Sequence, residues 1–378
     1  VSLGFDGAVG TLDLFAPPVA GTRPLIDLVA MSPDRYVAIH TFTIDTVPEP
    51  FTLTMLDGAG GVVVEASGGQ QLAGFGYGLG SGPAGTAFAT VGSESTLRWL
   101  DDALDITAPG VALPSAFGKP SVAVGDAGAV VAYLESFAGG ALRSVYADTT
   151  QASAPNLLAA SAMDYALAGG PAPALAWWDD SHTISVQRLD GVGAPVGTPS
   201  PLPEQGDEAA IAREQGGWRV AWLSDDDVIA SATVDAADTL GPTQVLALDG
   251  NRQTKVDLAF NGEVVMATWI DERDGAAVAH AARLAADGTP LEPAFSLGVV
   301  ASEAAVVAVG EDFVVLLVER LVDGTWGQYS HVVAVPVGAD GQLGSKVLLQ
   351  ADGNERHHEA LDAAVVEGGV VAGWKGKP

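Results

Sequence analysis

The chain has 378 residues, of which 47 are acidic and 17 are basic, so its formal net charge at pH 7 is -30. A charge of this sign and size repels phosphate backbones and anionic lipid headgroups, which excludes nucleic acid as an expected partner and favours solvent or cations. The chain has no cysteine, and this excludes disulfides, thiol nucleophiles and thiolate metal sites.

Hydrophobic residues make up 48% of the chain and occur in short runs bounded by Gly, Pro, Asp and Asn, a pattern typical of strands and turns. No run approaches the roughly 18 apolar residues of a membrane-spanning helix. The 47 glycines and 22 prolines interrupt any long helical pattern. The Ala-rich segment 355–366 has the composition of a helix, but it occupies a strand position of the repeat identified below, and we expect a strand there. The sequence therefore predicts an all-β protein.

The first residue is Val1, and no charged segment with an apolar core precedes it. This start is typical of a chain that has lost a targeting segment, so we expect export to the cell surface, the periplasm or the medium, with a lipid anchor as one option. The alternative is a cytosolic protein with an engineered start.

One unit recurs along the chain: a strand of small apolar residues, a tight turn, a Val-Ala-aromatic strand, an acidic loop, an alternating strand, a Gly-containing turn and a last short strand. A clear copy begins at Lys255, turns at Asn261 and Gly262, continues to Trp269 and ends at Gly288. Successive anchors of the second strand are 43 to 57 residues apart, the length of a four-stranded propeller blade. These anchors are His40, Thr90, Tyr133, Trp177, Trp222, Trp269, Leu317 and Trp374.

The spacing predicts a single β-propeller domain, 1–378, of about eight four-stranded blades. The tail 357–378 contains the first two strands of a unit and segment 1–17 contains the last two, so we expect one blade to be shared by both termini and to close the ring. Seven blades with loose ends is the alternative, and a two-sheet sandwich would not require a period. The expected blade pieces are 1–17 plus 357–378, 24–68, 70–117, 119–158, 162–204, 206–249, 253–299 and 302–350.

Two blades contain the phrase Val-x-Trp-x-Asp-x-Arg-x-Gly in whole or in part. The better copy runs from Trp269 through Asp271 and Arg273 to Gly275, and the second begins at Trp177. This phrase resembles that of secreted or lipid-anchored bacterial β-propeller repeat proteins, most of them uncharacterised. The resemblance covers about two thirds of the chain and implies the fold and the exported location, but no catalytic residue.

In a propeller, the loops between the second and third strands emerge on the same face as the links between blades. Here these segments are acidic, so we expect one strongly acidic face that binds a protein, a glycan or a cation. No cofactor is required, and calcium is an option, although no loop has the spaced Asp pattern of a calcium loop and a solvated turn is the simpler interpretation. The residues expected on this ligand-binding face are Asp179, Asp225, Asp271, Asp274, Glu319, Asp323, Glu355, His357 and His358.

The recurring aromatic anchors are expected to pack between blades, with carbohydrate stacking as the alternative. The sequence lacks nucleophile-elbow, phosphate-loop, zinc-helix and dinucleotide motifs. We therefore expect a non-catalytic extracellular or cell-surface binding propeller. A polysaccharide-active glycoside hydrolase or lyase is the alternative, and it would need two carboxylates in a deep axial pocket.

Overall fold

The computed structural model describes most of the chain, and the regular elements within it are all β-strands. No membrane-spanning helix is found in this part of the chain. The described residues are 2–4, 24–32, 34–42, 51–57, 62–67, 76–92, 95–106, 109–114, 117–136, 140–247, 253–272, 276–322, 328–351, 358–366 and 369–376.

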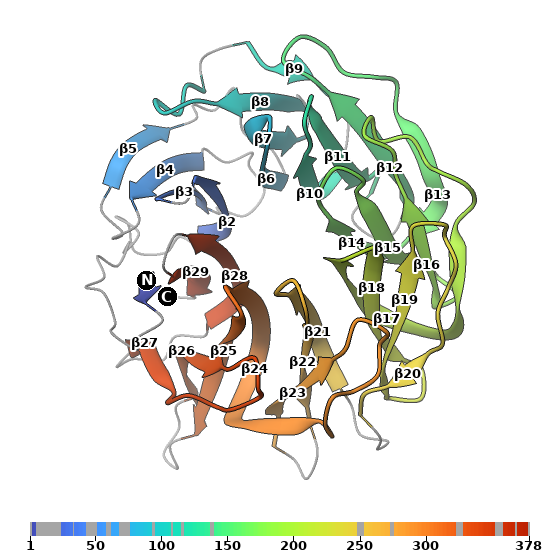
Figure 1. Ribbon diagram of the computed structural model, residues 1–378. Helices are drawn as coiled ribbons and strands as arrows, with labels where there is room; N and C mark the ends of the chain where they lie inside the picture. The colour runs from blue at the N-terminus through green and yellow to red at the C-terminus, as the bar shows by residue number, and fades with distance from the viewer. Residues whose placement is uncertain are drawn as a thin grey trace.

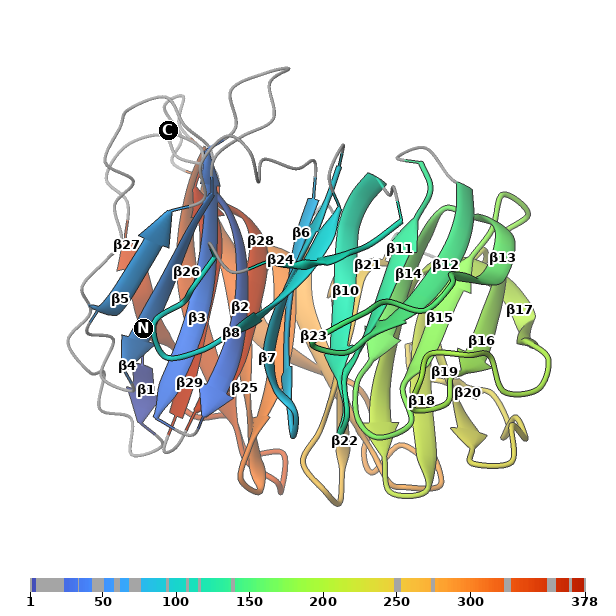
Figure 2. The ribbon, with the colours of Figure 1, turned by 90° about the horizontal axis from the view of Figure 1, so that it is seen from above.

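The strands form antiparallel sheets arranged in a ring around a central axis, and the first and last strands of the chain, β1 (Ser2–Gly4) and β29 (Gly369–Gly376), lie side by side in that ring (Figure 1). Seen at right angles, the strands run at a steep slant between two faces that carry the connecting loops (Figure 2). Within the three four-stranded sheets the strands follow chain order from the axis outward, so the first strand of each of these sheets is innermost (Figure 1). Short apolar runs suffice to build such a strand.

Three sheets have four strands each, in chain order. The first contains β2 (Pro24–Ser32), β3 (Arg35–Phe42), β4 (Phe51–Asp57) and β5 (Val62–Ser67). The second contains β6 (Gly76–Gly82), β7 (Gly85–Val91), β8 (Thr96–Leu100) and β9 (Val111–Ala112). The third contains β10 (Phe117–Val124), β11 (Ala129–Leu134), β12 (Gly140–Ala147) and β13 (Asn156–Ala162).

Two further sheets have seven strands each. One contains β14 (Asp164–Ala168), β15 (Ala174–Trp178), β16 (Thr183–Arg188), β17 (Ser200–Glu214), β18 (Gly217–Ser224), β19 (Ile229–Asp235) and β20 (Gln244–Val245). The other contains β21 (Gln253–Phe260), β22 (Val265–Asp271), β23 (Val278–Leu284), β24 (Phe295–Val309), β25 (Asp312–Val322), β26 (Gln328–Val337) and β27 (Val347–Ala351).

The seven-stranded sheets arise because β17 and β24 each serve two neighbours. The first part of β17 pairs with β16 and its second part pairs with β18, and β24 joins β23 to β25 in the same way. An irregularity in register between Asp207 and Ala210, and another between Ala301 and Ala304, bends each strand at the change of partner. The sequence predicted loops at these links. The structure instead places Glu204, Asp207 and Glu303 inside continuous strands.

The ring closes through a sheet built from both ends of the chain, in the order β1 (Ser2–Gly4), β29 (Gly369–Gly376), β28 (His358–Val366). Ser2 pairs with Val371 and Gly4 with Gly369, which confirms the expected pairing of the terminal strands. The Ala-rich segment forms β28, as the repeat predicts. The second N-terminal strand expected near 11–15 lies outside the described residues.

The core lies between neighbouring sheets, and the repeat anchors fill it. Thr90, Tyr133, Trp177, Trp222, Trp269 and Leu317 are all at most 4% exposed. Trp222 of β18, for example, lies in a cluster with Ile184 and Val186 of β16, in the other half of the same seven-stranded sheet. These anchors therefore pack between sheets, as expected, and are not exposed for stacking on a ligand.

One innermost strand is unusually rich in glycine, because β6 reads Gly-Tyr-Gly-Leu-Gly-Ser-Gly. A Cβ on Gly80 would lie 2.5 Å from the carbonyl oxygen of Val122 in β10, and one on Gly78 would lie 2.2 Å from that of Pro120. The two innermost strands thus approach at backbone distance, which only glycine permits.

Arginines link the two halves of each seven-stranded sheet near the turns between third and fourth strands. Arg188 donates to both carboxylate oxygens of Asp238, at 3.1 and 2.9 Å. Arg283 of β23 donates to the carbonyl oxygen of Ala339, which follows β26 in the same seven-stranded sheet, and it also donates to both oxygens of Glu292, at 2.7 and 2.6 Å. A planar guanidinium suits such two-point contacts.

Candidate functional site

Five polar residues gather where the β15–β16 turn and the β18–β19 turn flank the bend in β17. We call Asp179, His182, Asp207, Asp225 and Asp227 the junction cluster. Two backbone hydrogen bonds fix this arrangement, because Gly206 N–H donates to the His182 carbonyl at 2.8 Å and Asp225 N–H donates to the Gln205 carbonyl at 3.0 Å. Both turns and the link between the sheets therefore form one continuous surface.

Local chemistry sets the shape of these turns. Asp179 Oδ1 accepts hydrogen bonds from the backbone N–H groups of Ser181 at 2.8 Å and Thr183 at 3.1 Å, as expected of an aspartate that closes a turn. His182 and Asp227 have φ angles of 59° and 56°, in the left-handed region that few side chains adopt. The turn geometry thus fixes the backbone from which His182 projects.

His182 forms the central contact of the cluster. Its Nδ1 lies 2.8 Å from Asp225 Oδ1, and the two side chains are 52% and 49% exposed. The hydrogen bond and the negative charge of Asp225 raise the pKa of His182 above its ordinary value, and Asp207 and Asp179 add to this shift. The pair can therefore present both a positive and a negative group to a ligand.

Asp207 supplies a second, less exposed carboxyl group beside this pair. Burial raises its pKa, and the charges of Glu208, Asp225 and Asp227 raise it further, while His182 opposes the shift. Its charge therefore depends on the protonation of its neighbours.

Polar contacts continue from the junction cluster to the neighbouring innermost strands β21 and β24. Glu208 Oε2 accepts a hydrogen bond from the backbone N–H of Lys255, and Lys255 Nζ lies 3.7 Å from Glu303 Oε1. Glu208 and Lys255 both have positive φ angles, 47° and 61°. Three consecutive innermost strands, β17, β21 and β24, are thereby joined through one carboxylate, one lysine and a second carboxylate.

Deeper along the innermost strands, Asp257 joins β21 to β24. Its Oδ1 accepts from Leu258 N–H at 2.9 Å, and its Oδ2 accepts from Val306 N–H at 2.8 Å. The residue is partly exposed along the axis, but its carboxyl group is enclosed by protein, and this burial raises its pKa to about 6. Both oxygens are satisfied, so the group is structural.

The structure brings together only part of the predicted ligand face. Asp179 and Asp225 lie in the junction cluster, whereas Glu319 lies in β25, where it pairs with Lys346 at 2.5 Å. Asp271 departs from the expectation, because it is the last residue of β22 and is only 1% exposed. Burial between strands removes it from any exposed acidic face.

The side chains of the remaining predicted residues are outside what the structure describes. Asp274, Asp323, Glu355 and His357 lie outside the described residues, and His358 is placed only as the first residue of β28. His182 was not among the residues predicted for the ligand-binding face, although its place in an acidic turn was a usable signal.

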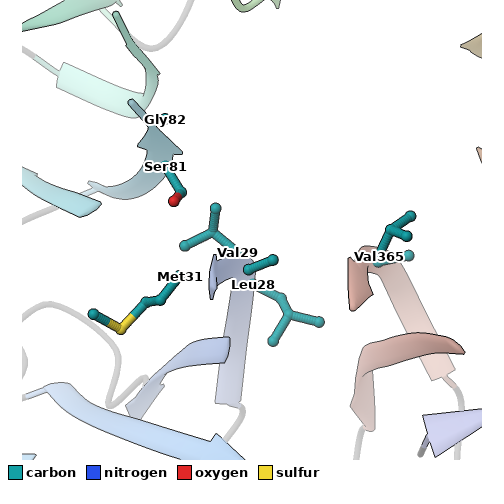
Figure 3. A pocket seen from close by; sticks show the side chains of 8 residues that line it. Leu28, Val29, Met31, Ser81, Gly82 and Val365 are labelled. Atoms are coloured by element: carbon teal, nitrogen blue, oxygen red, sulfur yellow. The ribbon is translucent and has the colours of Figure 1, made fainter. Parts of the chain in front are cut away.

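Two cavities lie among the innermost strands. One, of about 500 Å³, is lined by Leu28–Met31 of β2, by Ser81 and Gly82 of β6 and by Ala363 and Val365 of β28. Figure 3 shows Val29 and Leu28 on one side of this cavity and Val365 on the other. The second, of about 320 Å³, is lined by residues of β21, β24 and β28.

Neither cavity has the two carboxylates that glycoside hydrolysis needs. Among the residues that line them, Asp257 has the one carboxyl group, and it is already bonded to backbone. Within the part of the chain that the structure describes, no group of three or more His, Asp or Glu side chains is placed to hold a metal ion.

No protein-family model matches the chain, and no curated protein matches it. Solved structures do. The WD40 domain of SCAP from fission yeast superposes with a TM-score of 0.60 at 10% identity, over 95% of this chain and 96% of that one. The BP39L lectin from Burkholderia pseudomallei superposes with a TM-score of 0.59 at 15% identity, over 86% and 99%.

The fold is a β-propeller. Prolyl oligopeptidase B from Galerina marginata also matches, with a TM-score of 0.50 at 10% identity, over 90% of this chain and 54% of that one. Propellers thus serve in lectins, in a WD40 domain and in part of an enzyme. At identities of 10 to 15% the similarity establishes the fold alone. The function of this chain has to be argued from its own side chains.

Proposed function

We propose that this chain is a non-catalytic binding propeller that acts outside the cell and binds a protein or glycan through the face that carries the junction cluster. The observation that supports this proposal is the half-exposed His182–Asp225 pair, which two separate turns hold at 2.8 Å beside further carboxylates. Such a group of fixed donors and acceptors suits hydrogen-bonded recognition. The axial cavities supply no matching pair of catalytic groups.

We further propose that the propeller has eight blades. The bends in β17 and β24 divide each seven-stranded sheet into two four-stranded blades that share one strand. With the three four-stranded sheets and the closing sheet, this division gives the count that the repeat predicts.

The function is tested by screening the protein against a glycan array and a library of basic peptides, followed by calorimetry on each hit. We expect Asp225→Ala and His182→Ala to weaken binding by about tenfold, which corresponds to about 1.4 kcal/mol. The matched control is Asp102→Ala, which removes the exposed ion pair with Arg35. Equal binding by the cluster variants and the control would place the ligand elsewhere, and release of sugars from a polysaccharide would identify an enzyme instead.

Calcium is the cation that we propose for the acidic loops, and this proposal rests on the sequence alone. Thermal unfolding with calcium and then with a chelator tests it, because an ion that binds the folded state raises the midpoint by mass action. A rise of several degrees supports a calcium site, and no rise rejects it.

A further inference from the structure

The two seven-stranded sheets pack against each other at a buried face that contains two polar atoms without partners. Trp269 of β22 lies in one apolar cluster with Ala221 and Ile229 of the other sheet. Ser231 lies directly opposite Ala221 in the β18–β19 ladder, so its side chain is on the face that packs against Trp269. Trp269 and Ser231 are both 0% exposed. Among the described residues, neither the indole Nε1 nor the hydroxyl Oγ has a hydrogen-bond partner.

The equivalent position in the β11–β12 ladder shows how a buried serine is satisfied there. Ser144 lies opposite Ala132, the residue before one aromatic anchor, just as Ser231 lies opposite Ala221, the residue before another. The Ser144 hydroxyl group is buried and donates to the Gly193 carbonyl oxygen at 2.7 Å. Ser231 has no such acceptor among the described residues. A buried hydroxyl group without a partner is costly, so this one needs a ligand.

We infer that an ordered water molecule binds between the two seven-stranded sheets and bridges Trp269 Nε1 and Ser231 Oγ. The ligand has to accept from the indole N–H and either donate to or accept from the hydroxyl group, and water does both. Buried waters typically make two to four such bonds to polar groups that would otherwise be unpaired. Both atoms are closed to solvent, and the row that faces the indole consists of Ala210, Ala221 and Ser231, so the ligand has to be small.

The water would join the two sheets at a second place. Arg219 already links them through the carbonyl oxygens of Ala285 and Ala286. The water contact differs from that link, because it orients an indole ring that is otherwise held by apolar packing. The water site shares no residue with the junction cluster and is independent of the function proposed above.

Trp222 provides a matched control within the same chain. Its Nε1 is also buried and has no hydrogen-bond partner among the described residues. In the row that it faces, however, Val186 stands opposite Ala176, at the position that Ser231 occupies beside Trp269. A water beside Trp222 would therefore lack the second polar group. We expect a bound water at Trp269 and none at Trp222.

High-resolution crystallography and NMR cross-relaxation between protein and water test this site. We expect electron density for a water within about 3 Å of both Trp269 Nε1 and Ser231 Oγ. In isotope-labelled protein we expect a cross-peak between the Trp269 indole proton and water, and none for Trp222. Density that shows Ser231 bonded directly to Trp269, or no density between them, would overturn the inference. Equal cross-peaks at both indoles would show that the hydroxyl group is not needed and would overturn the bridge.

Two valine variants locate the water. Ser231→Val introduces the residue that the chain itself has beside Trp222, and we expect it to abolish the water cross-peak of Trp269 while the protein stays folded. Ser144→Val removes the equivalent hydroxyl group in another sheet, and we expect it to leave that cross-peak unchanged. A full cross-peak in Ser231→Val, or its loss in Ser144→Val, would refute the bridge. If Ser231→Val fails to fold, Ser231→Ala removes the hydroxyl group without adding volume and should still weaken the cross-peak, and an unchanged cross-peak would refute the bridge.

Discussion

Removal of Arg219 is the most informative perturbation of this propeller. Its side chain is 0% exposed, its Nε lies 2.6 Å from Glu214 Oε1, and its Nη2 donates to the carbonyl oxygens of Ala285 and Ala286 in the next sheet, each at 3.2 Å. The exposed fraction of the Glu214 side chain is 6%. Arg219→Ala therefore leaves a buried carboxyl group without its arginine partner and removes one donor from each of two carbonyl groups.

The expected cost follows from this geometry. Breaking a buried ion pair by removing one partner lowers the free energy of unfolding by about 3 to 5 kcal/mol. An unfolding entropy of about 2.1 cal/mol/K per residue gives about 0.8 kcal/mol/K for 378 residues, so a loss of about 4 kcal/mol lowers the midpoint by about 5 °C. Differential scanning calorimetry and urea denaturation both measure this change.

The pH dependence gives a second readout. Burial raises the pKa of Glu214 above its ordinary value, and the hydrogen bond and charge of Arg219 oppose that shift. Without Arg219 the folded state favours the protonated carboxyl group more strongly. Stability is then retained below the pKa of the unfolded chain and lost as the pH rises through the folded pKa, so the defect of Arg219→Ala is larger at pH 8 than at pH 4.

Two comparisons can refute this reasoning. Arg35→Ala breaks an ion pair whose partners are 36% and 80% exposed, and it should cost about 0 to 1 kcal/mol. The double variant Arg219→Met with Glu214→Leu removes both buried charges and should recover most of the lost stability. A loss for Arg219→Ala no greater than that for Arg35→Ala, or no recovery in the double variant, would show that the buried pair is not what joins the sheets.

Three further changes test other parts of the structure. Gly80→Ala forces a Cβ against the backbone of β10 and should cost about 1 to 3 kcal/mol in urea denaturation, whereas Gly125→Ala, with its nearest contact at 3.8 Å, should change stability by less than about 0.5 kcal/mol. The pKa of His182, measured by NMR titration, should lie above its ordinary value and fall in Asp225→Asn, so that the stabilisation from protonated His182 is lost as the pH rises; an unchanged pKa contradicts the pair. Because burial raises the pKa of Asp257 to about 6, stability should fall as the pH rises from about 4 to 6, and Asp257→Asn should remove that component.

Periodicity alone was enough to predict the architecture. The aromatic anchors recur at one place in the unit because each blade must fill the same wedge beside its neighbour, and the structure buries Trp222 and Trp269 completely. The same argument predicted a strand in the Ala-rich tail, against its local composition, and β28 confirms it.

The candidate site was harder to predict from the sequence than the fold. The acidic loops predicted that Asp179 and Asp225 lie on one ligand-binding face. No local pattern, however, shows that the turn between β15 and β16 places His182 against Asp225 of the turn between β18 and β19. Asp271 was misplaced because one residue decides whether an aspartate ends a buried strand or begins an exposed loop. The glycines of β6 and the bridging Arg188 depend on contacts between residues 42 and 50 positions apart in the chain, which lie in different repeat units.

The closing sheet also determines how the ring would respond to force. Among the described residues, β1 is held to β29 by three residue pairs, Ser2 to Val371, Leu3 to Val370 and Gly4 to Gly369. By contrast, the longer strands β17 and β24 each pair with a strand on either side, so that each seven-stranded sheet is continuous. Tension applied between the two ends of the chain would therefore load the three-pair ladder first, so that the ring opens at its seam while the paired blades stay joined.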